Sequence, residues 1–306
     1  MKKKLSMGLI FITIVMLMGC SSAKDANPNT SSEETSLTNE SSDNPDLAEG
    51  SQNSSEETEI QVFIAASLNT VMTELAEAYH EICPNVKIVY NADSSGTLLT
   101  QIEEGYECDI FFSAAQKQMN QLEDDGLVVS GTRANVVNNQ VVVISRKDSG
   151  TKVTGLENLK DAESIALAGG SVPVGRYTRQ ALIHLGVLET EEDAAAITAK
   201  QVSEALGGVE ISEQDNVSKV LLAVAEGSCE VGTTYYSDTY GYEEELDILQ
   251  TVSYNLTGNV IYPIAQVVNK EADEAQIKAA EDFLAYILSD EAEEVFQSYY
   301  FDTEVE

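Results

Sequence analysis

Residues 62–72 read VFIAASLNTVM, and this stretch sets a pattern that the rest of the chain repeats. An apolar run typical of a strand narrows to Ala65, Ala66 and Ser67, and apolar residues at helical spacing then continue to Tyr79. Small residues at such a junction let a ligand approach the backbone, and the hydroxyl of Ser67 could either cap the helix or face that ligand. The stretch alone leaves both interpretations open.

Strand patterns alternate with helical patterns along the chain. Strands are predicted at 60–65, 86–92, 108–114, 140–146, 164–169 and 260–268, and helices at 68–79, from 98 onward, at 176–185, at 217–225 and across 275–296. This alternation predicts an α/β fold with largely parallel sheets. Because ligands of open α/β sheets bind beyond the carboxyl ends of the strands, a site is expected where strands give way to helices.

The first 59 residues are set apart from this pattern. Three lysines precede an apolar run at 5–18 that is too short to span a bilayer, which is typical of a secretory signal. The run ends in LMGC at 17–20, which resembles the lipobox of bacterial lipoproteins and implies a signal peptide at 1–20 with lipidation of Cys20. Residues 21–59 are rich in Ser, Asn, Thr, Asp and Glu and are predicted to form a disordered acidic tether.

Charge and composition exclude several classes of site. The net charge is −35; the leader contributes +3 and the tether −9, which leaves −29 on residues 60–306 and argues against nucleic-acid binding. Cys83, Cys108 and Cys229 have no metal-ligand spacing, so we expect buried or partly buried thiols, with one disulfide left open. With only His80 and His184 in addition, no site with direct metal ligands is expected.

Three further junctions resemble the first in carrying small or hydroxyl residues before a helix or at a strand end: NADSSGT (91–97), GGSVPVGRY (169–177) and VGTTYYSD (231–238). A fourth, EQDNV (213–217), also opens a predicted helix. Arg176 is the only cation within them. Helix N-termini of this kind offer N–H and O–H donors to an anion. A fully ionised oxyanion has only acceptors, so neutral donors are enough to hold it and no cofactor is called for. A plain capped turn would explain each junction taken singly.

The stretches VFIAASL, SSGTLLTQIEEG, CDIFFSA, VPVGRYTRQAL and VGTTYYSD, in this order, resemble the substrate-binding proteins of molybdate ABC transporters over about 60–302. The resemblance implies a two-lobe periplasmic-binding-protein type II fold with a ligand cleft and two chain crossovers. The lobes would comprise 60–139 with 262–306, and 140–261. It further implies an extracytoplasmic, lipid-anchored and monomeric protein that delivers molybdate, and also tungstate, to a membrane permease.

The resemblance also implies which groups bind the oxyanion. They are two serine hydroxyls, two backbone N–H groups and one phenol, at Ser67, Ser95, Val174, Val217 and Tyr235. Ser94 is the one-residue alternative to Ser95, and Tyr236 is the alternative to Tyr235. Gly96 stands where some members of the family have a further serine.

Other functions remain open from the residues alone. The same fold could bind sulfate, another oxyanion or a small organic solute, because the size of a cavity cannot be read from sequence. A serine hydrolase using Ser95 or Ser171 would need a nearby histidine base, and both histidines are predicted to lie in helices, so no enzyme is expected. A structural lipoprotein or adhesin would show no stabilisation by a ligand.

Overall fold

A computed structural model describes residues 57–189 and 193–305 of the chain. The predicted signal peptide, Cys20 and all but the last three residues of the predicted tether lie outside the described residues. Strand β1 (Thr58–Ala65) begins two residues before the predicted strand start at 60, so the last two residues of the predicted tether belong to it. Thr58 and Glu59 extend the strand because they pair with Val86 and Lys87, and the Glu59 carboxylate is 2.6 Å from the Lys87 ammonium.

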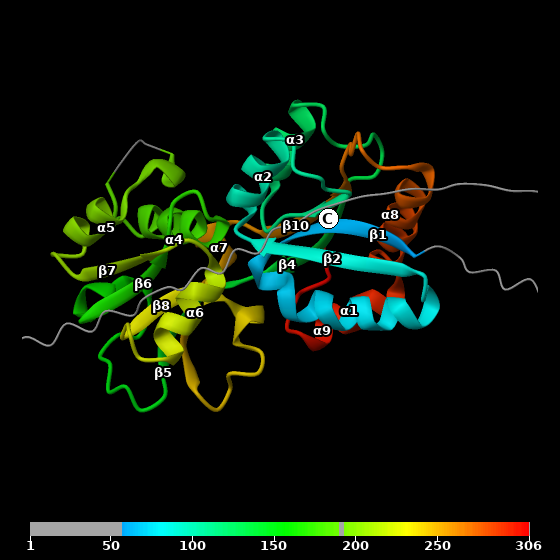
Figure 1. Cartoon of the computed structure of the whole chain (residues 1–306). Helices are drawn as coiled ribbons and strands as arrows, with labels where there is room; N and C mark the ends of the chain where they lie inside the picture. Colours follow the sequence, from blue (N-terminus) through cyan, green and yellow to red (C-terminus); the bar gives the residue numbers. More distant parts are fainter. Residues whose placement is uncertain (1–56, 190–192, 306) are drawn as a thin grey trace, which may run out of the picture. The chain divides into compact units, whose positions relative to one another are not determined.

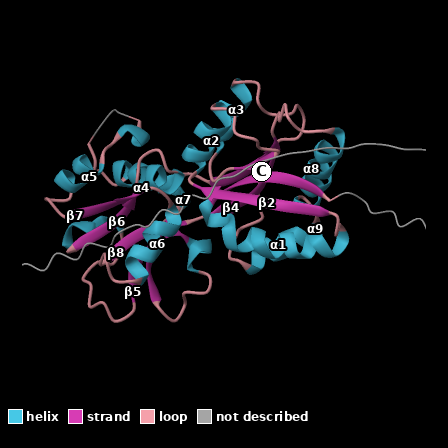
Figure 2. Cartoon of the chain, viewed as in Figure 1, coloured by secondary structure: helices cyan, strands magenta, loops and turns pink. Residues whose placement is uncertain are grey.

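The described strands form two five-stranded sheets, visible as the magenta arrows of Figure 2. In spatial order the first sheet consists of β2 (Val86–Asp93), β1, β3 (Ile110–Phe112), β10 (Val260–Gln266) and β4 (Ala134–Asn139). The second consists of β7 (Glu210–Gln214), β6 (Ser164–Ala168), β8 (Val231–Tyr235), β5 (Val141–Arg146) and β9 (Leu246–Thr251). Two sheets with helices packed against them are the predicted α/β architecture with two lobes (Figure 1).

The sheets are less parallel than predicted. In the first sheet β10 runs antiparallel to β3 and β4, and in the second β5 runs antiparallel to β8 and β9. The reason is the chain path, since β4 leads into β5 through the single residue Gln140, and β9 returns to β10 through α7 (Tyr254–Thr257). Two neighbouring strands become parallel when a crossover helix connects them within one sheet. A strand that enters directly from the other sheet has no such connection, so it can pair antiparallel.

The helices cover both faces of the first sheet. Successive residues of β1 alternate between two cores: Val62 and Ile64 pack with α1 (Asn69–Ile82), α8 (Glu274–Ile287) and α9 (Asp290–Ser298), whereas Phe63 packs with α2 (Ser95–Glu103) and α3 (Gln116–Asp124). Figure 1 shows α1 and α9 on one side of β1 and β2, with α2 and α3 on the other. A strand buried on both faces explains why its sequence is almost continuously apolar.

In the second lobe, the described helices are α4 (Pro173–His184), α5 (Ala199–Ala205), α6 (Val217–Ala225) and α7, with 3-10 segments at Leu156–Asp161, Ala194–Ala196 and Tyr236–Thr239. The one or two helices predicted across 275–296 are two, α8 and α9. The prediction missed β4, β7, β9, α3, α5 and the short α7. Cys83, Cys108 and Cys229 are free thiols, the last two buried, as predicted. Within 57–189 and 193–305, no helix has the length and apolar character needed to cross a membrane.

Candidate anion-binding site

One small cavity lies where strands of both sheets end and the following helices begin. Its wall in the first lobe comes from the end of β1, the 3-10 turn Ala66–Leu68, the end of β2, the start of α2 and Ala114. Its wall in the second lobe comes from the starts of α4 and α6 and the last residue of β8. All five predicted positions line it: Ser67, Ser95, Val174, Val217 and Tyr235.

The cavity is tight. The room available in it to the centre of a water-sized sphere is about 10 Å³, which is close to the need of a single water molecule. A more open hollow of about 460 Å³ lies elsewhere, at α1 and β2, but Glu57, Glu77 and Glu81 line it. Three carboxylates repel an anion more strongly than the one carboxylate of the small cavity, Asp93, so the small cavity is the better anion site and suits a compact solute.

Ser67 does not cap a helix. It lies in the 3-10 turn before α1, and no side chain caps either that turn or α1. Its hydroxyl oxygen is instead 2.8 Å from the hydroxyl of Tyr262, and both side chains are buried. The capping interpretation of Ser67 is therefore wrong, and its hydroxyl is held at the cavity wall.

Ser94 caps a helix, whereas Ser95 has a hydroxyl that can bind a ligand. Ser94 is the N-cap of α2, since its hydroxyl oxygen accepts a hydrogen bond from the Thr97 N–H over 3.2 Å. Ser95 is fully buried, and its hydroxyl oxygen accepts from the Ala114 N–H over 2.9 Å. Because that bond occupies an acceptor position, the Ser95 proton remains to be donated elsewhere. Both serines line the cavity, but only Ser95 has a hydroxyl that is not used in capping.

Val174 and Val217 bring backbone donors to the cavity. They are the second residue of α4 and the first residue of α6, and the N–H groups of a first helical turn have no acceptor in their own helix. Pro173 starts α4 at the position where a missing N–H costs nothing. Gly175 lets the helix start against β6, since a Cβ there would lie 2.2 Å from the Gly169 oxygen. The two helix dipoles add partial positive charge at this point.

Tyr235 contributes a hydroxyl with no hydrogen-bond partner among the described residues. Its side chain is 1% exposed, and its ring packs edge-on against Tyr262 at 5.9 Å between centroids. Burial, followed by the nearby Tyr262, raises the pKa of Tyr235 well above its usual value, so the phenol keeps its proton. The alternative, Tyr236, is exposed and stacks on Tyr300 instead. An unpaired buried hydroxyl is costly, and because this one lies in the lining of the cavity, a ligand there could become its partner.

Two polar contacts join the lobes near the cavity. Asp93, which also lines it, accepts a hydrogen bond from the Ser94 N–H over 2.7 Å and one from the Asn216 side-chain amide over 3.2 Å. In the second contact, Lys117 of the first lobe lies 2.9 Å from the carboxylate of Asp193, which Arg176 approaches to 3.8 Å. The predictions assigned no role to Asp93, although it stands in the NADSSGT junction, because one sequence cannot show that it meets Asn216.

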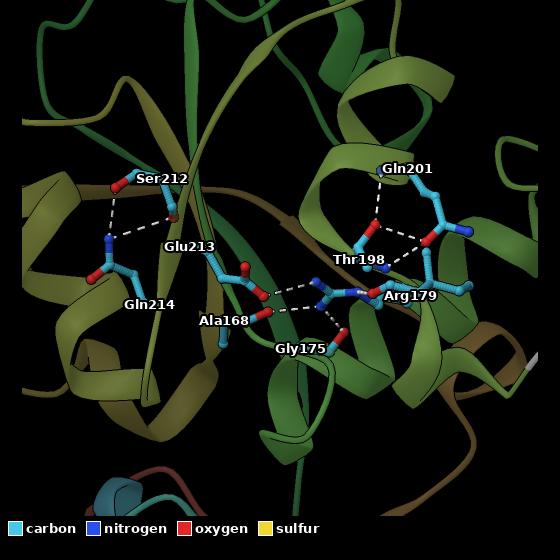
Figure 3. Close-up of polar contacts among 9 residues, drawn as sticks. Ala168, Gly175, Arg179, Thr198, Gln201, Ser212, Glu213 and Gln214 are labelled. Carbon is cyan, nitrogen blue, oxygen red and sulfur yellow. Dashed lines mark hydrogen bonds and ion pairs between the residues drawn. The ribbon is translucent and has the colours of Figure 1, made fainter.

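A buried cation behind the site also escaped prediction. Arg179 is fully buried, and its guanidinium donates to the oxygens of Ala168 (2.7 Å), Gly175 (2.9 Å) and Ile197 (2.8 Å), with Glu213 at 3.8 Å (Figure 3). Burial lowers the pKa of Arg179 to about 10, which the Glu213 charge partly opposes, so the side chain is charged at neutral pH. It fixes the junction between β6 and α4 and places a positive charge behind the first turn of α4. Arg176, the cation of the sequence motif, is not part of the described lining of the cavity and lies 3.8 Å from the Asp193 carboxylate instead.

The geometry does not favour hydrolysis. The described lining of the cavity includes neither histidine, and His184 contacts the Leu256 oxygen over 2.6 Å on the surface of the second lobe. Ser171 is exposed, and Ser95 shares the described lining of the cavity with the carboxylate of Asp93 but with no histidine. Across the part of the chain that the structure describes, no cluster of three or more His, Cys, Asp or Glu side chains could hold a metal ion.

Comparisons with known proteins agree with this geometry. A family model described as bacterial extracellular solute-binding protein matches residues 60–302. YvgL of Bacillus subtilis, described as a candidate ABC transporter substrate-binding lipoprotein, is 28% identical over 257 residues, covering 84% of this chain and 91% of that protein. The molybdate-binding protein ModA of Haemophilus influenzae is 29% identical over 248 residues, covering 79% of this chain and 89% of ModA.

A solved structure supports the same assignment. The substrate-binding domain of a candidate molybdenum ABC transporter from Clostridium difficile is 30% identical, with a TM-score of 0.58, and the match covers 81% of this chain and 100% of that domain. The predicted two-lobe fold is thereby confirmed. The chain belongs to the bacterial extracellular solute-binding proteins, a family that binds solutes for transport.

Proposed function

We propose that this protein captures a fully deprotonated tetrahedral oxyanion, molybdate and also tungstate, and passes it to the membrane permease of an ABC transporter. The observation that carries the proposal is the convergence of neutral donors from both lobes on one tight cavity, among them the unpartnered hydroxyl of Tyr235. The molybdate-binding relatives favour molybdate over other oxyanions.

Each donor has a role in this proposal. The hydroxyls of Ser67 and Ser95 bind the anion from the first lobe, and the N–H groups of Val174 and Val217 with the Tyr235 hydroxyl bind it from the second. Hydrogen bonds to an ionised partner are stronger than neutral ones, so five of them can replace the water shell of a dianion. We propose no catalytic step, since the role of the site is binding.

Selectivity among oxyanions follows from the size of the anion. Tungstate matches molybdate in charge and shape and is nearly the same size, so both should bind with similar affinity. Sulfate is smaller, and lobes closed around it would leave some donors too far from its oxygens. Buried donors without acceptors are costly, so sulfate should bind more weakly.

Binding would select the closed arrangement of the lobes. We propose the lobe limits 60–139 with 262–306 and 140–261, so that the two crossovers act as the hinge. In the same proposal the protein is a monomer, extracytoplasmic and tethered to the membrane through lipid on Cys20. Its strong negative charge fits a partner other than nucleic acid.

A comparison of ligands tests the proposal. Thermal unfolding should be measured with molybdate, tungstate, sulfate and phosphate, followed by calorimetry of each binding event. A ligand at a hundred times its dissociation constant adds about 2.7 kcal/mol to the free energy of unfolding, which the first two anions should reach at the lowest concentrations. Tighter binding of sulfate or phosphate than of molybdate would refute the assignment of the ligand.

A further inference from the structure

The hydroxyl of Ser67 is the end of a chain of buried hydrogen bonds that starts where the peptide first crosses between the sheets. Asn139 is the last residue of β4, and its side-chain amide nitrogen lies 3.2 Å from the hydroxyl of Tyr262 on β10. The Tyr262 hydroxyl lies 2.8 Å from that of Ser67. Asn139 and Tyr262 are at most 2% exposed and Ser67 is 9% exposed, so water does not replace these bonds.

The first bond of the chain has a defined direction. The carbonyl oxygen of the Asn139 side chain accepts from the Gln140 N–H over 2.8 Å and faces the Ser237 N–H at 3.5 Å. A flipped amide would place its NH₂ group against these two donors. The amide nitrogen therefore points the other way, where it donates to the hydroxyls of Ser237 (2.7 Å) and Tyr262.

The direction of the second bond follows from the first. The Tyr262 oxygen accepts from Asn139, so its single proton needs an acceptor, and the Ser67 oxygen is the acceptor within reach. Burial, followed by the charge of Asp238, raises the pKa of Tyr262 well above its usual value, so this proton is always present. Ser67 thus accepts from Tyr262 and keeps its own proton for the cavity.

We propose that Asn139 and Tyr262 are positioning residues that hold Ser67 as a donor, so that the site rejects anions which carry a proton. This inference rests on the proposed function. The hydroxyl of Ser95 is also held as a donor, because its oxygen accepts a hydrogen bond from the Ala114 N–H. Both serine hydroxyls can then donate to an anion, and in each of them a protein donor already occupies one of the two acceptor positions of the oxygen.

Rejection follows from the chemistry of the anion. Hydrogen phosphate and sulfate are tetrahedral dianions of similar size, but hydrogen phosphate has one O–H group that needs an acceptor. Against donors held in one direction, that O–H would be buried without a partner, which is costly. Asp93 is the competing explanation, since its carboxylate also lines the cavity and could accept such a proton.

The ratio of two dissociation constants tests the inference. Sulfate and phosphate should each be titrated by competition against molybdate, at an alkaline pH where phosphate is the hydrogen phosphate dianion. Sulfate and hydrogen phosphate have the same charge and similar size, so the ratio of their dissociation constants mainly reports the effect of the proton on hydrogen phosphate. The full-length wild type should prefer sulfate, and Tyr262→Phe should reduce this preference about tenfold, because the Ser67 hydroxyl can then turn and accept.

Three variants serve as controls. Tyr235→Phe removes a hydroxyl from the partner ring without changing the direction of Ser67, so both anions should weaken equally. Asn139→Asp reverses the chain: Tyr262 donates to the new carboxylate and accepts from Ser67, so the ratio should move further toward hydrogen phosphate. Asp93→Asn should leave the sulfate preference intact. Thermal unfolding of each variant shows that it is folded.

The outcomes separate the two proposals. Failure of the wild type to bind molybdate or tungstate would reject the proposed function itself. Molybdate binding with an unchanged sulfate preference in Tyr262→Phe would reject the inference alone, as would a wild type without that preference. If Tyr262→Phe does not fold, Asn139→Asp decides, because an unchanged ratio there also refutes it.

Discussion

Replacement of Tyr235 by phenylalanine should make the protein more stable and its ligand binding weaker. In the wild type the buried hydroxyl has lost its water and found no partner among the described residues. Such a group costs about 1–3 kcal/mol, and phenylalanine keeps the ring and its contact with Tyr262. We expect a gain of about 1 kcal/mol, which is about 2–4 °C in melting temperature for a protein of this size.

The same change removes one donor to a dianion. A hydrogen bond to a charged group contributes about 1.5–3 kcal/mol, so the dissociation constant for molybdate should rise about 10- to 150-fold. Melting without ligand measures the first effect, and calorimetry with molybdate measures the second. The opposite signs are the test, because a residue with a purely structural role would not improve stability while it weakens binding.

Tyr79 offers a matched control within the same chain. Its hydroxyl is also buried without a partner in the described part of the protein, but it packs against Phe283 in the first lobe and does not line the cavity. Tyr79→Phe should therefore raise the melting temperature and leave the affinity unchanged. If both variants change affinity alike, or if Tyr235→Phe lowers stability and binds normally, the reasoning about Tyr235 is refuted.

Three further changes test the parts around the donors. Gly96→Ala should weaken molybdate binding about tenfold by calorimetry, because a Cβ at this position would lie 2.9 Å from the Ser171 oxygen of the other lobe. The melting temperature should not fall, because alanine suits the helix. Unchanged affinity would show that the loop around Ser171 moves to make room for the new methyl group. Arg179→Met should lower the free energy of unfolding, measured in urea, by about 3 kcal/mol or more, because buried backbone oxygens would lose their hydrogen-bond donor. A smaller loss would contradict this. Burial raises the pKa of Asp238 to about 6, so its folded form keeps a proton that the unfolded chain releases near pH 4, and stability falls as the pH rises from about 4 to about 6. The stability advantage of Asp238→Asn over wild type, from melts at several pH values, should grow across that window, and a constant difference would contradict it.

The resemblance to the molybdate-binding proteins, which the order of the junction motifs carries, predicted five residues that all line the cavity. Ser67 and Tyr235 are 168 positions apart, yet Ser67 follows β1 of the first sheet and Tyr235 ends β8 of the second, and the strand ends of both sheets border the same cavity. What could not be predicted is how each group is bonded. Whether Ser67 caps a helix or meets Tyr262 depends on β10, which joins the first sheet only after the chain has crossed twice.

The missed strands have a physical explanation as well. The strand β4 reads ANVVNN, where three of six residues are asparagines, and its last two asparagines are buried because their side chains bond backbone groups at the first crossover. The strand β7 reads EISEQ and is an edge strand whose residues are only partly buried. Neither stretch needs the apolar run or strict alternation that a sequence pattern detects. Arg179 was missed likewise, because a helical arginine is ordinarily exposed.

The protein and its proposed ligand are both negatively charged, and groups close to the cavity offset the repulsion between them. Exposed carboxylates lose their effect beyond about 8–10 Å in salt, whereas the first turns of α4 and α6 act on the cavity directly. Arg179 adds a full positive charge behind α4 without entering the cavity, where its fork of donors would bind sulfate or phosphate as readily as molybdate. Neutral donors in a fixed direction can instead separate anions by size and by protonation. A site built on a cation within the cavity would gain affinity and lose that discrimination.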